Sequence, residues 1–505
     1  MQVQQNVPLE LKLGQDLSEV QDVLCAIISK MWTQKNKSYH VIIPRKYKMV
    51  TLLKIGKGIR CTNLPKSAKL KIEKDLCFDN PEYLSAMKQG RFIPADMSSH
   101  IHLYYSENEE YWIPRGYIFY LRKHLRLNNH MVIIKDHTLL LKPLQLAFIG
   151  KLRPYQKKAK DDIMSYPVGV LEAATGSGKT VIAISVIVHR QQPTLIIVHS
   201  KELLYQWQEA IKKFTGEDCG LIGDGKFKIK PITIGIINTV KKNIPKLEKH
   251  FGHIICDECH RIAASTWAET IQDFPARHYL GLTATPFRRD GLGYAIFASL
   301  GPKRHKVNKE MLFKTKAVLK PDVYKIESNF RYAFANDYST MISELTKDNA
   351  RNYLIVSSIH ADLKRFNENV LIVSDRKKHC LEMQRMLFDD FMIDSLVLTG
   401  SVNKKERERT IKQVKSGKCK VLFATITLIG EGFDAPDLTT LFLTTPVKFS
   451  GRLLQAAGRV LRPKKNKIPR IYDIRDNAID ILKYSGYNRD RIYKKEWGGV
   501  NNEEL

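Results

Sequence analysis

The chain has 505 residues, of which 43% are hydrophobic, enough for about two to four domains with apolar cores. Its 82 Lys and Arg residues outnumber 52 Asp and Glu residues, giving a formal net charge of +30. This excess favours a polyanionic partner such as nucleic acid. We find no long apolar run and no signal peptide, so we expect no membrane partner and an intracellular, cytoplasmic location.

Residues 1–148 contain no nucleotide-binding motif. Short apolar runs there alternate with turn residues, which predicts a small α+β accessory domain, and apolar residues at helical spacing predict a helix over 18–33. An aromatic cluster precedes the basic residues 122–126 and could stack nucleic-acid bases, with packing in a strand core as the alternative. The cluster comprises Tyr104, Tyr105, Tyr111, Trp112, Tyr117, Phe119 and Tyr120.

The pattern changes after Leu152, where short apolar strands alternate with helical stretches. This alternation predicts parallel βαβ units covered on both faces by helices, and we assign 149–302 to a first α/β lobe. A basic stretch from 303 to about 320 is expected to connect two lobes, either as a solvated linker or as a strand-contacting projection. A second alternating series follows, so 303–505 comprises this connection and a second α/β lobe. Strands are expected near 169–171, 194–198, 232–236, 253–256, 369–373, 420–423 and 440–443.

A phosphate-binding loop lies between an apolar strand and a helical run. The pattern G-x-x-x-x-G-K-[ST] is present, except that Ala173 replaces its first glycine. Backbone amides of this loop would wrap the phosphates of ATP, Lys179 would reach the β- and γ-phosphates, and the Thr180 hydroxyl would bind Mg²⁺. The expected loop residues are Thr175, Gly176, Ser177, Gly178, Lys179 and Thr180.

An acidic pair ends the apolar strand near 253–256. Asp257 is expected to hold Mg²⁺, and Glu258 to orient or deprotonate the attacking water. His260 follows this pair and is expected to link the nucleotide state to the lobe interface. Cys256 and Cys259 flank the pair, and we interpret them as small apolar residues rather than as zinc ligands.

Two arginines lie about 280 positions beyond the phosphate loop. Arg459 and Arg462 are spaced by one helical turn, so both can face one neighbour and stabilise charge on the γ-phosphate. The accompanying Gln455 and Gly458 favour this function over an exposed basic helix. Hydrolysis that needs residues so far apart predicts a cleft between two lobes.

Together these motifs resemble those of superfamily 2 helicases, over roughly 152–462. Leu152-Arg-Pro-Tyr-Gln156 resembles the Q motif, which implies ATP contacts from Arg153 and Gln156. Thr283-Ala-Thr285 matches motif III, implying that Thr283 and Thr285 couple hydrolysis to lobe movement. Residues 425–434 resemble motif V, implying a nucleic-acid contact by Thr425 and nucleotide contacts by Gly432 and Asp434.

The resemblance also implies how nucleic acid is held. Segments near 198–207, including Trp207, and 237–239 resemble motifs Ia and Ib, which contact the strand. The further strand-contacting residues expected are His199, Ser200, Thr239, Thr399 and Gly400. The implied fold has two tandem RecA-like doubly wound parallel-sheet lobes beside the α+β accessory domain.

Within the superfamily, the Asp-Glu-Cys-His box and the string at 281–291 resemble the group that contains XPB, RecG-like motors and the phage helicase UvsW. The implied activity is an ATP- and Mg²⁺-dependent DNA helicase, working as a monomeric motor on single-stranded, forked or branched DNA in replication, recombination or repair. If the chain is phage-encoded, its location would be the host bacterial cytoplasm. The alternatives are a duplex DNA translocase that does not separate strands, an RNA helicase, and a binding protein that uses ATP only as a clamp.

Overall fold

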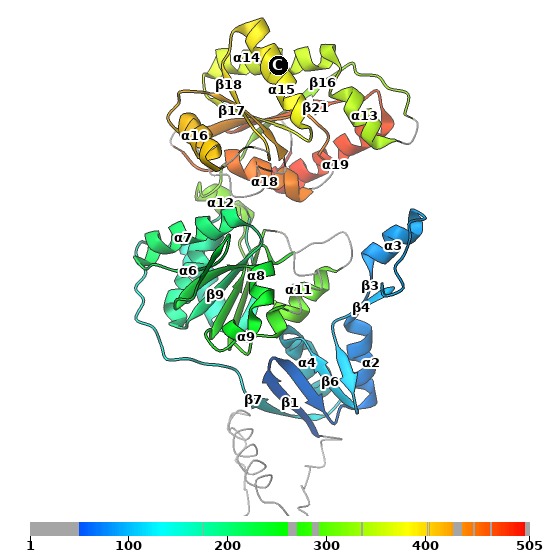
Figure 1. Cartoon of the computed structure of the whole chain (residues 1–505), viewed down its shortest axis with the longest axis vertical. Helices are drawn as coiled ribbons and strands as arrows, with labels where there is room; N and C mark the ends of the chain where they lie inside the picture. The colour runs from blue at the N-terminus through cyan, green and yellow to red at the C-terminus, as the bar shows by residue number, and fades with distance from the viewer. Residues whose placement is uncertain are drawn as a thin grey trace, which may run out of the picture.

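The computed structural model shows two α/β lobes stacked along the long axis, with an N-terminal unit beside the first lobe (Figure 1). The expected helix over 18–33 lies outside the described residues. The side chains of Gln455 and Arg459 are also outside them. The structure describes residues 50–174, 176–260, 270–284, 292–334, 337–400, 402, 404–426, 428, 437–447, 450–464 and 467–499.

The N-terminal unit is built on a five-stranded sheet with the order β5-β6-β2-β1-β7. Its core lies between one face of the sheet and helices α2 and α4, where Leu53, Ile59 and Tyr117 are buried. The α+β composition expected from the sequence is present in the described residues. The elements are β1 (Val50–Gly56), β2 (Gly58–Thr62), α2 (Lys66–Asp75), β5 (Tyr105–Glu107), β6 (Glu110–Ile113), the 3-10 helix η1 (Arg115–Tyr117), α4 (Ile118–Leu127) and β7 (Met131–Asp136).

An arm projects from this unit between α2 and β5 (Figure 1). It consists of β3 (Cys77–Asp79), α3 (Pro81–Lys88) and β4 (His100–His102), with β3 and β4 paired antiparallel. The side chain of Asn80 caps α3 by accepting hydrogen bonds from the backbone amides of Glu82 and Tyr83.

The N-terminal unit is fastened to the first lobe. The buried Arg115 guanidinium donates hydrogen bonds to the carbonyl oxygens of Ala276 and Arg277, and Arg277 pairs with Asp136 at 2.7 Å. Gly116 packs against the backbone of the first lobe so closely that a Cβ there would lie 2.1 Å from the Gly301 nitrogen. We infer that the N-terminal unit moves with the first lobe.

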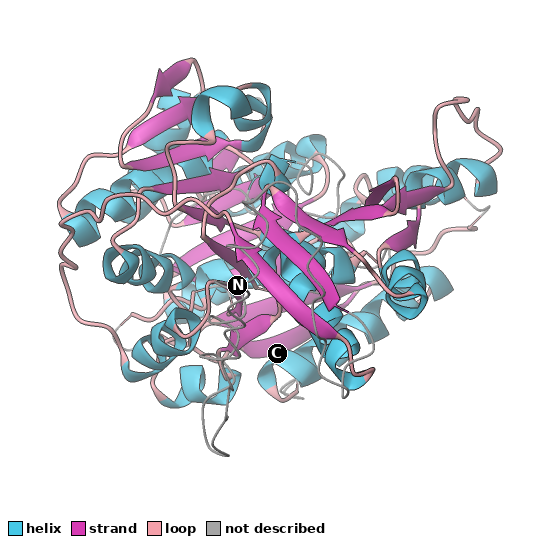
Figure 2. Ribbon diagram, turned by 90° about the horizontal axis from the view of Figure 1, so that it is seen from below, coloured by secondary structure: helices cyan, strands magenta, loops and turns pink. Residues whose placement is uncertain are grey.

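The first lobe contains an eight-stranded sheet with the order β11-β10-β12-β9-β13-β14-β8-β15, parallel except for the β10–β11 hairpin. Central strands such as β9 are continuous, fully buried apolar runs, as expected where helices cover both faces of a sheet. Figure 2 shows helices around the strands of the sheets. The elements are α5 (Pro154–Met164), β8 (Val168–Glu172), α6 (Lys179–Arg190), β9 (Thr194–Val198), α7 (Lys201–Thr215), β10 (Gly220–Gly223), β11 (Lys226–Lys228), β12 (Ile232–Ile236), α8 (Ile237–Lys242), α9 (Ile244–Leu247), β13 (His253–Cys256), β14 (His278–Thr283), α11 (Gly293–Leu300) and β15 (Lys303–Lys306).

We expected a basic connection between the lobes from residue 303 onward. For its first four residues this expectation is wrong. Lys303–Lys306 forms β15, which pairs parallel to β8 at the edge of the first sheet. Lys303 and Lys306 both pair with Glu172 of β8, at 2.8 and 3.2 Å. The segment continues as α12 (Lys309–Lys314), whose Leu312 is buried in the core cluster shared by the two lobes. This stretch is therefore a packed part of the fold rather than a solvated linker.

The second lobe has a six-stranded, wholly parallel sheet with the order β16-β21-β20-β17-β19-β18. Two α/β lobes with parallel sheets were predicted from the sequence, and this prediction is confirmed. The elements are β16 (Asp322–Glu327), α13 (Tyr338–Leu345), α14 (Asn349–Phe366), β17 (Asn369–Ser374), α15 (Lys377–Phe391), β18 (Ser395–Leu398), α16 (Lys404–Lys415), β19 (Val421–Thr425), β20 (Leu438–Leu443), α18 (Ser450–Val460), β21 (Arg470–Arg475) and α19 (Asp480–Trp497).

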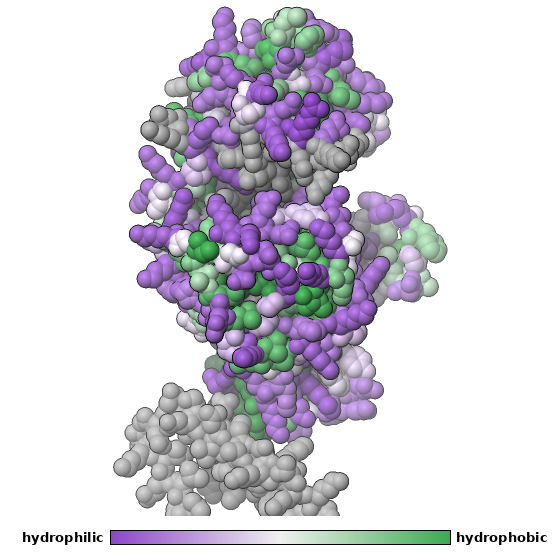
Figure 3. Space-filling view, turned by 60° about the vertical axis from the view of Figure 1, so that its left-hand side comes forward, coloured by the Kyte–Doolittle hydropathy of each residue, from purple (hydrophilic) through white to green (hydrophobic). Residues whose placement is uncertain are grey.

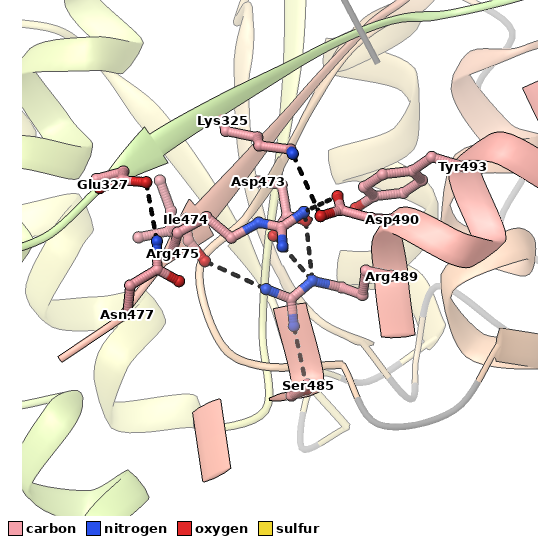
Figure 4. A network of polar contacts seen from close by, with 10 residues as sticks. All are labelled: Lys325, Glu327, Asp473, Ile474, Arg475, Asn477, Ser485, Arg489, Asp490 and Tyr493. Carbon is pink, nitrogen blue, oxygen red and sulfur yellow. Dashed lines mark hydrogen bonds and ion pairs between the residues drawn. The ribbon is translucent and has the colours of Figure 1, made fainter. Parts of the chain in front are cut away.

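A buried polar network fixes α19 against β21 (Figure 4). The carboxylate of Asp473 accepts hydrogen bonds from Arg489 Nε at 2.9 Å and from the Tyr493 hydroxyl at 2.7 Å, and pairs with Arg475 at 2.8 Å. Arg475 also pairs with Asp490 at 2.7 Å. Each buried charge therefore has a partner, which the low dielectric of the interior requires.

Hydrophilic side chains cover most of the face drawn in Figure 3, and apolar side chains gather mainly over the middle of the molecule, on the first lobe. Among the described residues, no helix is both long and apolar enough to cross a membrane.

Candidate nucleotide site between the lobes

The phosphate loop joins β8 to α6. Gly176 and Gly178 both have φ near +84°, a left-handed conformation that glycine adopts without steric cost. This conformation turns successive amides toward one side at the start of α6, where the helix dipole also favours an anion. Thr175 lies outside the described residues. Lys179 and Thr180 begin the helix, at the end of the loop where the sequence placed them.

The segment expected to recognise adenine lies against this loop. The Gln156 side chain accepts a hydrogen bond from the Arg153 amide at 2.9 Å, and its Nε2 donates to the Ser177 carbonyl oxygen at 3.4 Å. The Tyr155 hydroxyl donates to the same oxygen at 2.8 Å. Two side chains of α5 therefore support the phosphate loop. Tyr155, which is buried in the core, was not among the residues for which the sequence predicted a function.

The acidic pair follows β13 and faces the loop. The Lys179 amino group lies 3.9 Å from Glu258 Oε1 and donates a hydrogen bond to the Ala173 carbonyl oxygen at 3.3 Å. Glu258 has φ +49°, a strained conformation for a residue with a side chain and one that is common at functional sites. Its Oε2 lies 3.3 Å from His260 Nδ1. The same His260 nitrogen is 3.4 Å from the hydroxyl of Thr283, at the end of β14.

The structure corrects the expectation for Trp207. Its resemblance to motif Ia implied a contact with the nucleic-acid strand, but the side chain is only 1% exposed. Its indole Nε1 donates a hydrogen bond to Asp257 Oδ2 at 2.8 Å. Helical spacing was the signal that could have found this burial, because Leu204, Trp207 and Ile211 all lie on the buried face of α7.

Burial and neighbouring charges shift the pKa values of Asp257 and Glu258 in opposite directions. Burial raises the pKa of Asp257 to about 6, and the charge of Glu258 adds to the rise. Burial also disfavours ionisation of Glu258, but Lys179 and His260 outweigh it and lower the pKa of Glu258 to about 2. Glu258 is therefore the more acidic of the two carboxyl groups.

The neighbouring thiols are part of the core. Cys256 ends β13, and Cys256 and Cys259 are both fully buried, with pKa values raised by that burial.

The residues present fit ATP and a divalent cation. The amides near Gly176 and Gly178, the Lys179 amine and the Asp257 carboxylate converge at the ends of β8 and β13. Oε2 of Glu258 is buried and accepts no hydrogen bond of good geometry from the residues that the structure describes. Oxygen ligands are those that Mg²⁺ prefers, and Thr180 and Asp257 supply them.

The connection between the lobes passes directly over this site. A Cβ at Gly176 would lie 3.6 Å from Cγ2 of Val318, and the next residue, Leu319, donates its amide hydrogen to the Leu461 carbonyl oxygen at 2.9 Å. Leu461 immediately precedes Arg462, and burial lowers the pKa of the Arg462 guanidinium. The backbone therefore links the phosphate loop to the arginine segment through two consecutive residues that no sequence motif marked.

The remaining candidates are placed as follows. Arg459 and Gln455 lie on α18, and their side chains are not among those described. Thr425 ends β19, while Thr399 and Gly400 directly follow β18, with Thr399 4% exposed. Thr285, Gly432 and Asp434 lie outside the described residues.

In the first lobe, His199 and Ser200 directly follow β9, and Thr239 lies in α8. The Ser200 hydroxyl caps α7 by accepting a hydrogen bond from the Leu203 amide at 3.4 Å. Ser200 therefore has a structural function whether or not it contacts a strand.

Comparison with known proteins assigns the family. The family described as "Type III restriction enzyme, res subunit" matches residues 149–288, and "Helicase conserved C-terminal domain" matches 349–464. The chain belongs to the superfamily 2 helicases, in the group that contains XPB. As a member, it is an ATP-dependent helicase. This confirms the resemblance that the motifs indicated.

Similar proteins support the assignment. Protein 161L of Invertebrate iridescent virus 6 is 28% identical over 393 residues, which cover 71% of this chain and 84% of that protein. The protein named DNA 3'-5' translocase XPB2, from Sulfurisphaera tokodaii, is 27% identical over 354 residues, covering 62% of this chain and 79% of that protein. The structure of S. cerevisiae Dbp5 bound to RNA and ADP BeF3 matches with TM-score 0.51 and 17% identity, covering 70% of this chain and 89% of that one. At this identity the match shows the fold alone, and it confirms the tandem RecA-like lobes.

Proposed function

We propose that this helicase acts on DNA and uses ATP hydrolysis to unwind or remodel forks and junctions in replication, recombination or repair. The observation that carries the nucleotide part is the convergence of Lys179, Asp257 and Glu258 at the strand ends of the first lobe. The DNA part is supported by relatives named DNA 3'-5' translocase and DNA 3'-5' helicase. The net charge of +30 supports a polyanionic substrate.

In the proposed mechanism the first lobe binds ATP. Amides around Gly176 and Gly178 hold the phosphates, and Lys179 reaches the β- and γ-phosphates. Thr180 and Asp257 hold Mg²⁺, which neutralises charge on the phosphates when bound. Arg153 and Gln156 recognise the adenine, as the likeness to the family's Q motif implies.

Hydrolysis then needs a positioned water and a second source of positive charge. The Glu258 carboxylate lies 3.9 Å from the Lys179 amino group and directly follows Asp257, so it is the proposed acceptor of the water proton. Arg459 and Arg462 from the second lobe stabilise charge that develops on the γ-phosphate, and Gln455 accompanies them as a further candidate of the catalytic site. His260, Thr283 and Thr285 transmit the nucleotide state to the lobe interface.

Closure and release of the lobes would move the DNA. Each lobe holds the backbone of one strand through hydroxyls and amides, so binding is salt-sensitive and tolerant of sequence. The proposed contacts are His199, Ser200 and Thr239 in the first lobe, and Thr425, Thr399 and Gly400 in the second, with Gly432 and Asp434 on the nucleotide side.

A second candidate function is duplex translocation without strand separation, favoured by a relative whose name says translocase. The two are separated by an assay with a labelled fork and a triplex substrate of equal length. A fork-remodelling helicase releases the fork strand and requires Lys179 to do so. Displacement of the triplex strand alone, with an intact fork, would assign translocation without unwinding.

A further inference from the structure

One row of side chains crosses the whole N-terminal sheet. The register pairs Lys135 with Lys54, Lys54 with Arg60, Arg60 with Trp112, and Trp112 with Tyr105. Directly paired residues point to the same face of a sheet, so all five side chains lie on one face. With strands about 4.8 Å apart, the row is roughly 19 Å long.

This face is opposite the core. The adjacent row contains Leu53, Cys61 and Tyr111, which are buried against α2 and α4. Because side chains alternate between faces along a strand, the row from Lys135 to Tyr105 points away from these helices. Tyr105 is 57% exposed. We call this row the basic–aromatic face.

Its aromatic end is ordered. The rings of Tyr105 and Trp112 lie 5.3 Å apart, and the Arg60 guanidinium lies over the Trp112 ring at 5.5 Å. Glu110 pairs with Arg60, and Glu107 accepts a hydrogen bond from the Tyr105 hydroxyl at 2.9 Å. The two carboxylates therefore hold the arginine and the tyrosine in place beside the indole.

The structure divides the aromatic cluster noted in the sequence. Tyr111 and Tyr117 are core residues, with exposures of 7% and 0%, as the packing alternative predicted. Tyr105 and Trp112 are on the other face, beside basic residues. Alternation along β6 separates Tyr111 from Trp112, which are neighbours in the sequence.

We propose that the basic–aromatic face binds single-stranded DNA, with bases stacked on Trp112 and Tyr105 and phosphates near Lys54 and Arg60. This deepens the proposed function, on which the choice of DNA rests. Unpaired bases expose the ring faces that aromatic side chains need for stacking, whereas the bases of a duplex are already stacked on one another. Positive charge at the other end of the row complements the strand's phosphates.

The attachment of this sheet to the first lobe determines how a bound strand would move. Arg115 and Asp136 fasten the N-terminal unit to the first lobe, and Asp136 directly follows Lys135. A strand held on the face therefore travels with the first lobe. The face would keep one separated strand from re-annealing while the second lobe changes its position.

The test measures binding of the full chain to fluorescent oligo-dT and to a blunt duplex of equal length, without nucleotide. The double variant Trp112→Leu/Tyr105→Ala should bind oligo-dT about tenfold more weakly or worse, as expected when two stacking rings are lost. Its affinity for the duplex should change much less. Tyr484→Ala is the matched control, because Tyr484 is 69% exposed on α19 of the second lobe and should leave both affinities unchanged.

Two further variants distinguish a loss of stacking from misfolding of the double variant. Trp112→Phe keeps an aromatic ring and should retain most of the oligo-dT affinity, while Lys54→Gln should reduce the salt dependence of binding. Unchanged oligo-dT affinity in the double variant would overturn the proposal. An equal loss of duplex binding would overturn it as well.

The proposed function fails differently. Wild-type protein whose ATPase does not respond to any DNA would contradict the DNA motor, whatever these affinities are.

Discussion

The indole nitrogen of Trp207 donates a hydrogen bond to Asp257 at 2.8 Å, so a buried aromatic residue of α7 holds the acidic residue proposed to bind Mg²⁺. The bond favours the ionised carboxylate, whose pKa burial has raised to about 6. Trp207→Phe keeps an aromatic ring but removes the donor, so the pKa of Asp257 should rise further. We predict that the acid limb of the kcat/KM profile for ATP moves to higher pH.

The sign follows from the protonation state that hydrolysis requires. Protonated Asp257 cannot serve as an anionic ligand, so activity falls as pH decreases through its pKa, and a higher pKa places that fall at higher pH. Trp497→Phe is the control, because Trp497 is also buried but lies at the end of α19. Superimposable profiles for wild type and Trp207→Phe would contradict this function of Trp207.

Replacing Glu258 and replacing Lys179 should affect ATP hydrolysis and ATP binding differently. Glu258→Gln removes the proposed proton acceptor while leaving the phosphate loop intact, so ATPase should fall about 10² to 10⁴-fold with ATP binding retained. Lys179→Ala should lose both activity and tight binding, since its amine is proposed to contact the phosphates. Steady-state ATPase beside binding of a fluorescent ATP analogue separates the two. Loss of nucleotide binding in Glu258→Gln would argue against its assigned function.

The conformation of the phosphate loop can be tested against a matched glycine. Gly176 and Gly225 have φ of +84° and +73°, so alanine strains either position by about 1 kcal/mol or more. Gly225 lies in the turn between β10 and β11, where a Cβ would meet no atom within 4 Å. We expect Gly176→Ala to weaken ATP binding about tenfold and Gly225→Ala to leave it unchanged, as titration calorimetry would measure. Equal affinities in both variants would contradict the proposed amide contacts.

The network in Figure 4 should matter for stability. Asp473→Ala leaves Arg475 and Arg489 buried without their shared carboxylate, which should cost about 3–5 kcal/mol of the free energy of unfolding. The surface pair of Glu382 with Arg385 is the contrast, and Glu382→Ala should cost under about 1 kcal/mol. Urea unfolding of both variants gives the comparison. Similar midpoints would show that the second lobe does not depend on the network.

Local sequence predicted the parts of this fold that depend on local physics. Strands buried on both faces are continuous apolar runs, so segments such as Thr194–Val198 were recognisable. The phosphate loop was also recognisable in the sequence. Two of its positions have a left-handed backbone conformation, which favours glycine, and both are glycines. By contrast, the polar strand Lys303–Lys306 has no apolar pattern of its own. Its pairing with β8 and with Glu172 is a tertiary contact that no local period encodes.

The motif residues of the candidate site were recognisable in the sequence, whereas the residues that contact and support them were not. Tyr155 and Trp207 could be assigned only to a helix face, since their partners lie 22 and 50 positions away in the sequence. The contacts of Val318 and Leu319 with Gly176 and Leu461 depend on how two lobes pack. Such contacts arise from the folded topology, which spacing along one chain does not specify.

The most direct measurement is the ATPase rate of the full chain with no nucleic acid, single-stranded DNA, duplex DNA, a forked junction or RNA, beside Lys179→Ala. A fork-remodelling DNA helicase should be stimulated most by the fork, and the Lys179→Ala variant should show no stimulation. Stimulation by RNA alone would contradict the DNA assignment. Equal rates under all five conditions would contradict a nucleic-acid-driven motor.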